Sequence, residues 1–232
     1  MVAALASGHE VLTAENSSTS SLVQRFLALD GDDLHQYRAL RHFVARNEKL
    51  DKSAWMDVWT EADQSSFTWQ IVSEGGSGYI RSKLFLEALE AERKLREEGS
   101  DARGAITGEN YTFIDCVSVD IDLACVNLKP RRKDVLLVDG AIYLHPETGD
   151  LVRIEGFLSK SPSFWTRQVN VLRRYSRIGG VRVPVAVEST ASVRLAGPST
   201  FTMTYEYESV NGKRVGSPSV VSRQSPVGSR QS

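Results

Sequence analysis

Apolar and polar side chains alternate along several stretches of the chain, most clearly near its C-terminal end. In residues 201–208, Phe, Met or Tyr occupies every odd position and Thr or Glu occupies every even one. Strand residues two apart lie on the same side of a sheet, so this run predicts a strand with one apolar face. Two earlier runs repeat the pattern, and we expect neighbouring strands to form one broad apolar surface. The residues expected on it are Trp55, Trp59, Phe67, Trp69, Ile71, Met203, Tyr205 and Tyr207.

Runs rich in aromatic and β-branched residues, separated by turn residues, predict about ten antiparallel strands. The first three, at residues 37–47, 54–61 and 67–74, are expected to form a meander. The others are expected at residues 110–117, 123–129, 135–144, 151–159, 164–178, 181–195 and 201–210.

One long amphipathic helix is predicted over residues 77–98. Ile80, Leu84, Ala88, Ala91 and Leu95 form a stripe at helical spacing, and a glycine follows the last turn. We expect the stripe to lie on the apolar sheet surface. Ile80 and Leu84 therefore join the sheet residues named above as candidates to line a cavity between the sheet and this helix. A second, shorter helix is expected to begin at residue 20 or 21 and to end near residue 29.

The order of these elements predicts the fold class. Helices that stand before and within a series of strands, rather than between successive strands, disfavour parallel doubly wound folds and α/β barrels. We therefore predict an α+β fold, in which a large curved antiparallel sheet forms an unclosed half β-barrel and the two main helices cover its concave face. We expect a flexible leader over residues 1–19, a single domain over residues 20–212, and a disordered tail over residues 213–232.

Length and charge exclude several classes of protein. The 232 residues include 28 basic and 29 acidic side chains, for a net charge of −1, and 41% of the residues are hydrophobic. These values are typical of one globular domain with a sizeable core. Nucleic acid is not expected as a partner, because nucleic-acid-binding domains usually carry a basic excess. No apolar run approaches the ~18 residues that a membrane-spanning helix needs.

Two features bear on the cellular compartment. Ala4-Leu5-Ala6 matches the A-x-A pattern of signal-peptide cleavage sites, but the basic and apolar segments that normally precede it are missing. The match is either a chance Ala-rich start or the end of a secretory signal that begins upstream of Met1. Cys116 and Cys125 flank a predicted turn and would face each other in a hairpin, close enough for a disulfide. The alternative is a pair of buried free thiols.

The succession of elements and two local segments resemble a known family. Residues 140–156, which read as strand, turn and strand, and residues 205–212 resemble the LolA/LolB/MucB-like group of bacterial cell-envelope proteins. The resemblance implies an unclosed β-barrel with a helical lid and a hydrophobic cavity that accepts acyl chains in the periplasm. No motif here matches the lid arginine of lipoprotein carriers, so no functional residue is carried over. With the cysteine and A-x-A patterns, the resemblance leads us to expect an exported, periplasmic protein.

Catalytic and metal-binding patterns are scarce. The run 74–79 is similar to a nucleophile elbow around Ser77, but Tyr79 stands where G-x-S-x-G requires glycine, so we interpret Ser77 as a helix cap. The four histidines are scattered, and the two cysteines match no zinc motif. We expect no metal and no cofactor.

Basic residues cluster in a predicted turn at residues 129–133. A solvated outer surface is one interpretation of this cluster. The other is a patch that binds anionic lipid head groups or an acidic protein surface. The residues concerned are Lys129, Arg131, Arg132 and Lys133.

Three hypotheses about function follow. The first is a non-enzymatic periplasmic binder or carrier of an apolar ligand, such as an acyl chain, a lipid or a lipoprotein, held between the sheet and the helical lid. The second is a structural or sensory cell-envelope module, whose concave face is a filled core and whose surface binds another protein. The third is a serine hydrolase built around Ser77.

Overall fold

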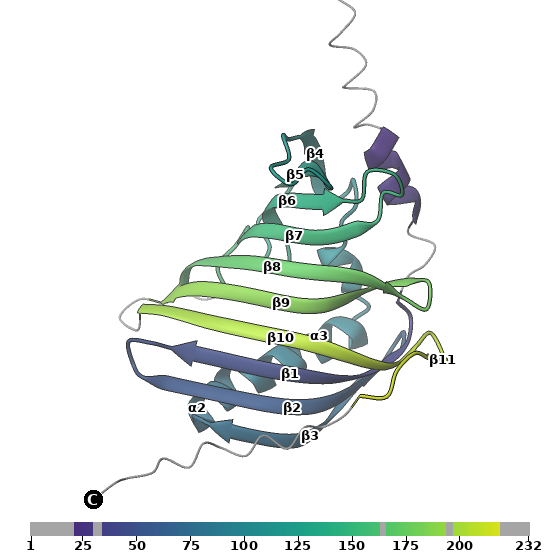
Figure 1. Ribbon diagram of the computed structural model, residues 1–232. Coiled ribbons are helices and arrows are strands. Elements are labelled where there is room, and N and C mark those ends of the chain that lie inside the picture. Colours follow the sequence, from purple (N-terminus) through teal and green to yellow (C-terminus); the bar gives the residue numbers. More distant parts are fainter. Residues whose placement is uncertain (1–20, 30–33, 163–165, 194–196, 219–232) are drawn as a thin grey trace, which may run out of the picture.

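The chain folds around one large antiparallel sheet (Figure 1). The structure is a computed structural model and describes residues 21–29, 34–162, 166–193 and 197–218. Its strands are β1 (Tyr37–Asn47), β2 (Lys52–Ala62), β3 (Phe67–Gly76), β4 (Tyr111–Asp115), β5 (Ala124–Pro130), β6 (Val138–Leu144), β7 (Leu151–Leu158), β8 (Thr166–Ile178), β9 (Val181–Val193), β10 (Gly197–Val210) and β11 (Lys213–Arg214).

The sheet is continuous but unclosed. Its strand order is β3-β2-β1-β10-β9-β8-β7-β6-β5-β4, and β11 pairs with β10. β10 returns from the end of the chain to pair with β1, with Phe43 opposite Met203. The edges of the described sheet are therefore β3 and β4, which do not meet. The predicted α+β fold with a large, curved, unclosed antiparallel sheet is confirmed.

A single helical segment crosses one face of the sheet. It begins as α2 (Gly78–Ile80), continues through a π-helical turn, η2 (Arg81–Leu86), and ends as α3 (Glu87–Glu97). A short 3-10 turn, η3 (Asp101–Gly104), follows it. Figure 1 shows this segment behind the strands. No helix among the described residues is long and apolar enough to cross a membrane.

A second helix, residues 21–28, lies beside the other half of the sheet (Figure 1). Its Leu22 and Phe26 are buried in a cluster that contains Ile154 of β7. Residues that pair across neighbouring strands lie on the same face of a sheet. Ile154 pairs with Arg173, Arg173 pairs with Val187, and Val187 pairs with Met203, which packs against the cluster that contains Phe85 and Leu89 of the long helix. Both helices therefore cover the same face, as predicted.

The π-helical turn changes which side of the long helix faces the sheet. The predicted stripe assumed regular α-helix, in which residues 80 and 84 align. In the structure Ile80 and Phe85 align instead, because a π-helical turn spaces equivalent positions five residues apart. Phe85 and Leu89 are buried, whereas Leu84 is 40% exposed. The prediction that Leu84 lines the interior is therefore wrong.

The sheet also continues beyond the predicted end of the domain. β11 pairs with the end of β10, and the Val215 side chain packs against the hydrophobic cluster under α3. The Val215 N–H donates to the Glu208 carbonyl oxygen at 2.9 Å. The boundary expected after Gly212 is therefore too early. The expected leader (residues 1–19) and residues 219–232 lie outside the described residues.

β6 and β7 approach each other closely where Gly140 pairs with Gly156. A Cβ on Gly140 would lie 2.1 Å from the Glu155 carbonyl oxygen and 2.6 Å from the Gly156 Cα. Gly156 itself has φ 153°, a conformation that favours glycine. This crossing lies within residues 140–156, the segment that carries the family resemblance.

We expect Gly140→Ala to lower the free energy of unfolding by about 2 kcal/mol, because the added methyl group overlaps backbone atoms that cannot move aside. Gly108→Ala is the matched control, since no atom lies within 4 Å of a Cβ built there. Urea denaturation of both variants checks the prediction. Equal stability of the two variants would contradict it.

Candidate functional site

The predicted apolar surface lies mostly under the helical segment. Five of the predicted sheet residues, from β3 and β10, belong to or pack against one hydrophobic cluster that also contains Phe85 and Leu89 of the helix. Ile80 of α2 packs against the same cluster. Ile71 continues this face of β3, opposite Val58, and is 39% exposed near the sheet edge. The predicted residues that the structure brings together here are Phe67, Trp69, Ile80, Met203, Tyr205 and Tyr207.

Trp55 and Trp59 lie on the opposite, convex face of the sheet, so their predicted place in the interior is wrong. On β2 the buried Met56 and Val58 alternate with them and point into the core. The Trp59 ring packs against the Arg38 guanidinium, whose central carbon lies 4.6 Å from the ring centre. Both faces of β2 carry large apolar side chains, and alternation alone does not say which face is inside.

The space between the sheet and the helical segment is filled by side chains. Phe85 is 0% exposed and Leu89 is 1% exposed. The Phe85 ring centre lies 5.4 Å from that of Phe43 and 6.1 Å from that of Phe201, which are contact distances for aromatic pairs. Three hollows on the described residues lie elsewhere, and one of them, of about 590 Å³, is lined by β5 to β9. At Phe85 and Leu89, side chains therefore occupy the place of the predicted cavity.

One charged side chain lies within this apolar cluster. Arg41 projects from β1 and is only 2% exposed. Its guanidinium donates to both carboxylate oxygens of Glu92 on α3, at 2.7 and 2.9 Å, and also to the Tyr37 hydroxyl. The Tyr37 hydroxyl in turn donates to Glu92 at 3.0 Å. The Arg41 guanidinium also packs over the Tyr205 ring, 4.7 Å from its centre. A bidentate ion pair thus joins the sheet to the helix.

These contacts determine how the cluster titrates. Burial alone would raise the pKa of the Glu92 carboxyl, but the Arg41 charge and the hydrogen bonds from Arg41 and Tyr37 hold that pKa below its usual value of 4.5. Burial raises the pKa of Tyr205 to about 12 and also raises that of Tyr37. At neutral pH the site therefore contains an ionised pair surrounded by neutral tyrosines.

Sequence reasoning missed Arg41 and Glu92. The signal for Arg41 was present, because it occupies an odd position in a run whose other odd positions include Tyr37, Ala39 and Phe43. A charged residue on the apolar face of a strand needs a partner. The signal for Glu92 was hidden, since the π-helical turn moves it onto the inner side of the helix.

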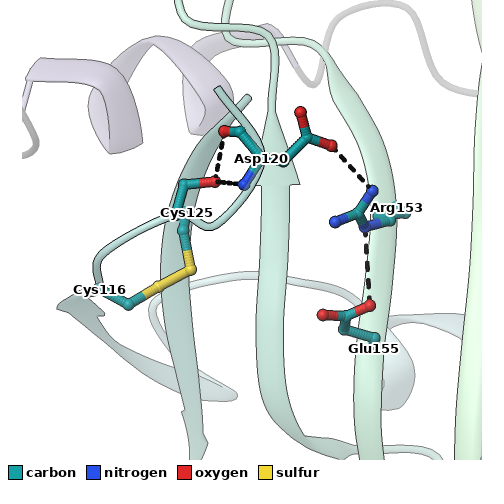
Figure 2. Close-up of a disulfide and its surroundings, with 6 residues drawn as sticks. Cys116, Asp120, Cys125, Arg153 and Glu155 are labelled. Carbon is teal, nitrogen blue, oxygen red and sulfur yellow. Dashed lines mark hydrogen bonds and ion pairs between the residues drawn. A yellow bond between two sulfur atoms is a disulfide. The ribbon is translucent and has the colours of Figure 1, made fainter. Parts of the chain in front are cut away.

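Cys116 and Cys125 form a disulfide at the loop end of the β4–β5 hairpin (Figure 2). Asp115 and Val126 form the last pair of the strand ladder, and the cysteines stand next to them with their Cα atoms 5.4 Å apart. The bond closes the segment 117–124 into a loop. Disulfides persist in oxidising compartments.

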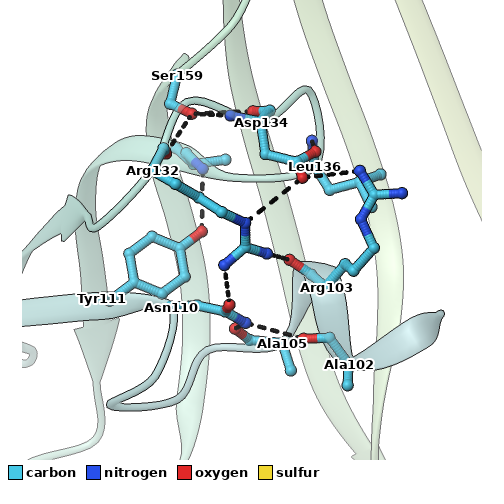
Figure 3. A network of polar contacts seen from close by, with 10 residues as sticks. Ala102, Arg103, Ala105, Asn110, Tyr111, Arg132, Asp134, Leu136 and Ser159 are labelled. Atoms are coloured by element: carbon cyan, nitrogen blue, oxygen red, sulfur yellow. Dashed lines mark hydrogen bonds and ion pairs between the residues drawn. The ribbon is translucent and has the colours of Figure 1, made fainter.

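The turn between β5 and β6 is bound to the segment that follows α3 (Figure 3). Arg132 donates to the Asn110 side-chain oxygen at 2.5 Å and to the Arg103 carbonyl at 2.8 Å. Arg103 pairs with the buried carboxylate of Asp134 at 2.9 Å. The network therefore fastens the far end of the helical segment to the second half of the sheet.

The other predicted basic residues have different surroundings. Arg131 donates to the carbonyl oxygens of residues 108 and 111, and Lys129 pairs with Asp139 at 2.7 Å. Lys133 is exposed. Arg131 and Arg132 thus have structural roles, and binding of an anionic surface by the cluster stays a prediction.

Ser77 occupies the N-cap position of α2, but its side chain makes no capping hydrogen bond. Its N–H donates to the Ser53 carbonyl at 2.8 Å. Within the described residues, no histidine or carboxylate contacts the Ser77 hydroxyl as a general base would. The hydrolase hypothesis therefore gains no support from this site.

Comparisons with known proteins concern the fold alone. No protein-family model and no curated protein sequence matches the chain. Among solved structures, it is similar to a DUF1329 family protein from Desulfovibrio piger, with a TM-score of 0.41, 8% identity, and coverage of 81% of this chain and 90% of that one. A domain assigned to outer membrane lipoprotein sorting, from Vibrio parahaemolyticus, gives a TM-score of 0.45 at 8% identity, and the match covers 85% of this chain and 95% of that one.

A LolA superfamily protein from Nitrosomonas europaea gives a TM-score of 0.37 at 11% identity, covering 81% of this chain and 90% of that one. The names of the last two neighbours contain terms of the group that residues 140–156 and 205–212 resemble, and the likeness concerns the fold alone. Because the identities are so low, what the present chain binds must be argued from its own residues.

We expect Arg41→Met to lower the free energy of unfolding by about 3 kcal/mol, because it leaves the Glu92 carboxylate without its partner. The Glu92 side chain keeps 32% of its surface exposed, which limits the cost. Arg46→Met, at an exposed position of the same strand, should change little. Adding Glu92→Gln to Arg41→Met should cost less than the two single effects combined. Strict additivity in urea denaturation would contradict the pairing.

The lowered pKa of Glu92 predicts an acid-sensitive contribution to stability. A carboxyl whose pKa is lower when folded stabilises the protein above its unfolded pKa of 4.5, and this contribution is lost as pH falls through the folded value. Between about pH 5 and about pH 3, the urea midpoint should therefore fall less in Glu92→Gln than in the unmodified protein. Glu97→Gln, at an exposed glutamate of the same helix, is the control and should follow the unmodified protein.

Proposed function

We propose that the protein is a non-enzymatic binder or carrier of an apolar ligand, such as an acyl chain, which the concave face of the sheet holds under the helical segment. The observation that carries the proposal is the aromatic and aliphatic surface of β10, where Phe201, Met203 and Tyr205 are only partly buried. A ligand that covers such a surface gains about 25 cal/mol for each Å² of apolar area removed from water.

Because the interior is filled, the ligand must displace part of the helical segment. Lifting Phe85 and Leu89 from the core costs about 2–3 kcal/mol each, and separating Arg41 from Glu92 costs about 3 kcal/mol more. Burial of an acyl chain contributes about 0.8 kcal/mol per methylene, so about 9 to 11 methylenes offset this cost. The balance favours long-chain ligands and leaves short ones unbound.

We further propose that the protein acts in the periplasm. The Cys116–Cys125 disulfide supports an oxidising compartment. The A-x-A pattern at residues 4–6, which lies outside the described residues, agrees with export.

The filled interior favours a second candidate, the structural or sensory envelope module. In that case the concave face is only a core, and the protein acts through its outer surface. The burial of Phe85 and Leu89 is the specific observation in its favour. The two candidates differ in whether any apolar molecule binds.

Native mass spectrometry of the purified chain, followed by solvent extraction, tests the first candidate directly. We expect a bound long-chain lipid or fatty acid. A fluorescent fatty acid should bind to the delipidated protein, and Met203→Gln should weaken this binding about tenfold, because it buries an amide without a partner.

Thr204→Gln is the matched control, since Thr204 is exposed and lies next to Met203 on the opposite face of β10. Thermal unfolding of both variants checks that the fold is intact. No bound molecule and no probe binding would reject the apolar-ligand proposal in favour of the second candidate.

A further inference from the structure

Three large aliphatic side chains project from the loop that the disulfide closes. Val117 is 94% exposed, Val119 is 93% exposed and Ile121 is 97% exposed, the highest values among the exposed large hydrophobic residues of the described chain. We refer to these three residues as the aliphatic tip. Isolated exposed apolar residues are common, but three at alternate positions of one short loop are a feature of interaction sites.

Ser118 and Asp120 of the same loop are bonded within the protein. The Ser118 hydroxyl donates to the Asp120 carbonyl at 2.8 Å, and the Asp120 N–H donates to the Ser118 oxygen at 3.1 Å. The Asp120 carboxylate accepts from Arg153 of β7 at 3.2 Å (Figure 2). Arg153 in turn packs over the Tyr143 ring of β6, 3.9 Å from its centre. The loop is therefore bound to β7 through Arg153 as well as closed by the disulfide.

This construction prepares the aliphatic tip for binding. A loop that is already held in one conformation loses little conformational entropy when a partner covers it. The Ser118 hydroxyl, the Asp120 carboxylate and the N–H groups of Asp120 and Asp122 already have partners within the protein, so a partner that covers the loop leaves these groups satisfied. What the loop presents outward is the methyl groups of Val117, Val119 and Ile121, beside the exposed Asp122.

We propose that the aliphatic tip docks into an apolar groove of a partner protein and that basic residues border this groove. Residues 115–124 contain three aspartates and no basic residue. Asp120 is paired with Arg153, whereas Asp122 is exposed beside Ile121. A partner with Lys or Arg at the rim of its groove complements this charge, and the apolar floor takes the aliphatic side chains.

The same charges disfavour two other occupants. A bilayer that contains anionic lipids repels an acidic loop, and the tip has none of the Trp, Tyr, Lys or Arg residues that anchor loops at membrane interfaces. A second copy of this chain would bring two acidic loops together if the tips met across a twofold axis. The proposal is independent of whether the concave face binds a ligand.

Photo-crosslinking in the native host cells tests the proposal with the full chain. Val119 is replaced by p-benzoylphenylalanine, and the crosslinked adduct is identified by mass spectrometry. Leu50, which is 51% exposed in the β1–β2 turn, carries the same replacement as a control. We expect one protein adduct that depends on the position of the probe, and then a direct binding measurement with that purified protein.

In this measurement, Val119→Ser with Ile121→Ser should raise the dissociation constant at least about tenfold, whereas Leu50→Ser should leave it unchanged. Raising the salt concentration from about 50 mM to about 500 mM should also weaken binding, because it screens the rim charges. The fold is unaffected by the double change, since both side chains are almost fully exposed.

Several results would overturn the proposal. In the crosslinking experiment, these are an adduct with lipid, with a second copy or with residues 1–20 of the same chain, or no adduct specific to position 119. In the binding measurement, it is a partner protein whose affinity is the same for the double variant and for the unmodified protein. If binding of the identified protein does not depend on salt, the proposal that basic residues border its groove is rejected.

Discussion

A guanidinium group in the core of a protein is stable only when its charge is paired and its N–H groups are bonded. Arg41 is in this position, and the Glu92 carboxylate on α3 is its partner. The pair therefore fixes where the helix lies on the sheet. Phe85 and Leu89 share the inner side of the helix with Glu92, so the same placement brings their side chains into the core. The ion pair determines position, and apolar burial supplies most of the stability.

The helical segment connects two hydrophobic clusters. At its start, Ile80 and Phe85 pack on β1 to β3 and β10. Beyond its end, the network of Arg103, Arg132 and Asp134 fastens the chain to the second half of the sheet. A ligand that enters under α3 must therefore break the first set of contacts while the second can hold the far end in place. The aliphatic tip belongs to the second half, so the proposed docking and the proposed ligand binding would use different parts of the fold.

Much of the fold could be predicted from the sequence, because the signals are local. Alternation at residues 201–208 predicted a strand with one apolar face, and its Met203 and Tyr205 do lie under the helix. Two cysteines that flank a turn predicted a close approach, and the structure joins them. The same local signals did not find the site, since a partner such as Glu92 for Arg41 comes from a segment 51 residues away.

The sequence by itself determined most of the strands, the turns and the antiparallel direction of successive strands, because side-chain alternation and turn chemistry act over a few residues. Only the tertiary structure decided which face of each element became the inside. Trp55 and Trp59 belong to a strand with two apolar faces, and packing against the helix chose the other face for the core. The π-helical turn likewise rotated Leu84 outward and Phe85 inward. Burial is a property of the assembled layers, so no single segment encodes it.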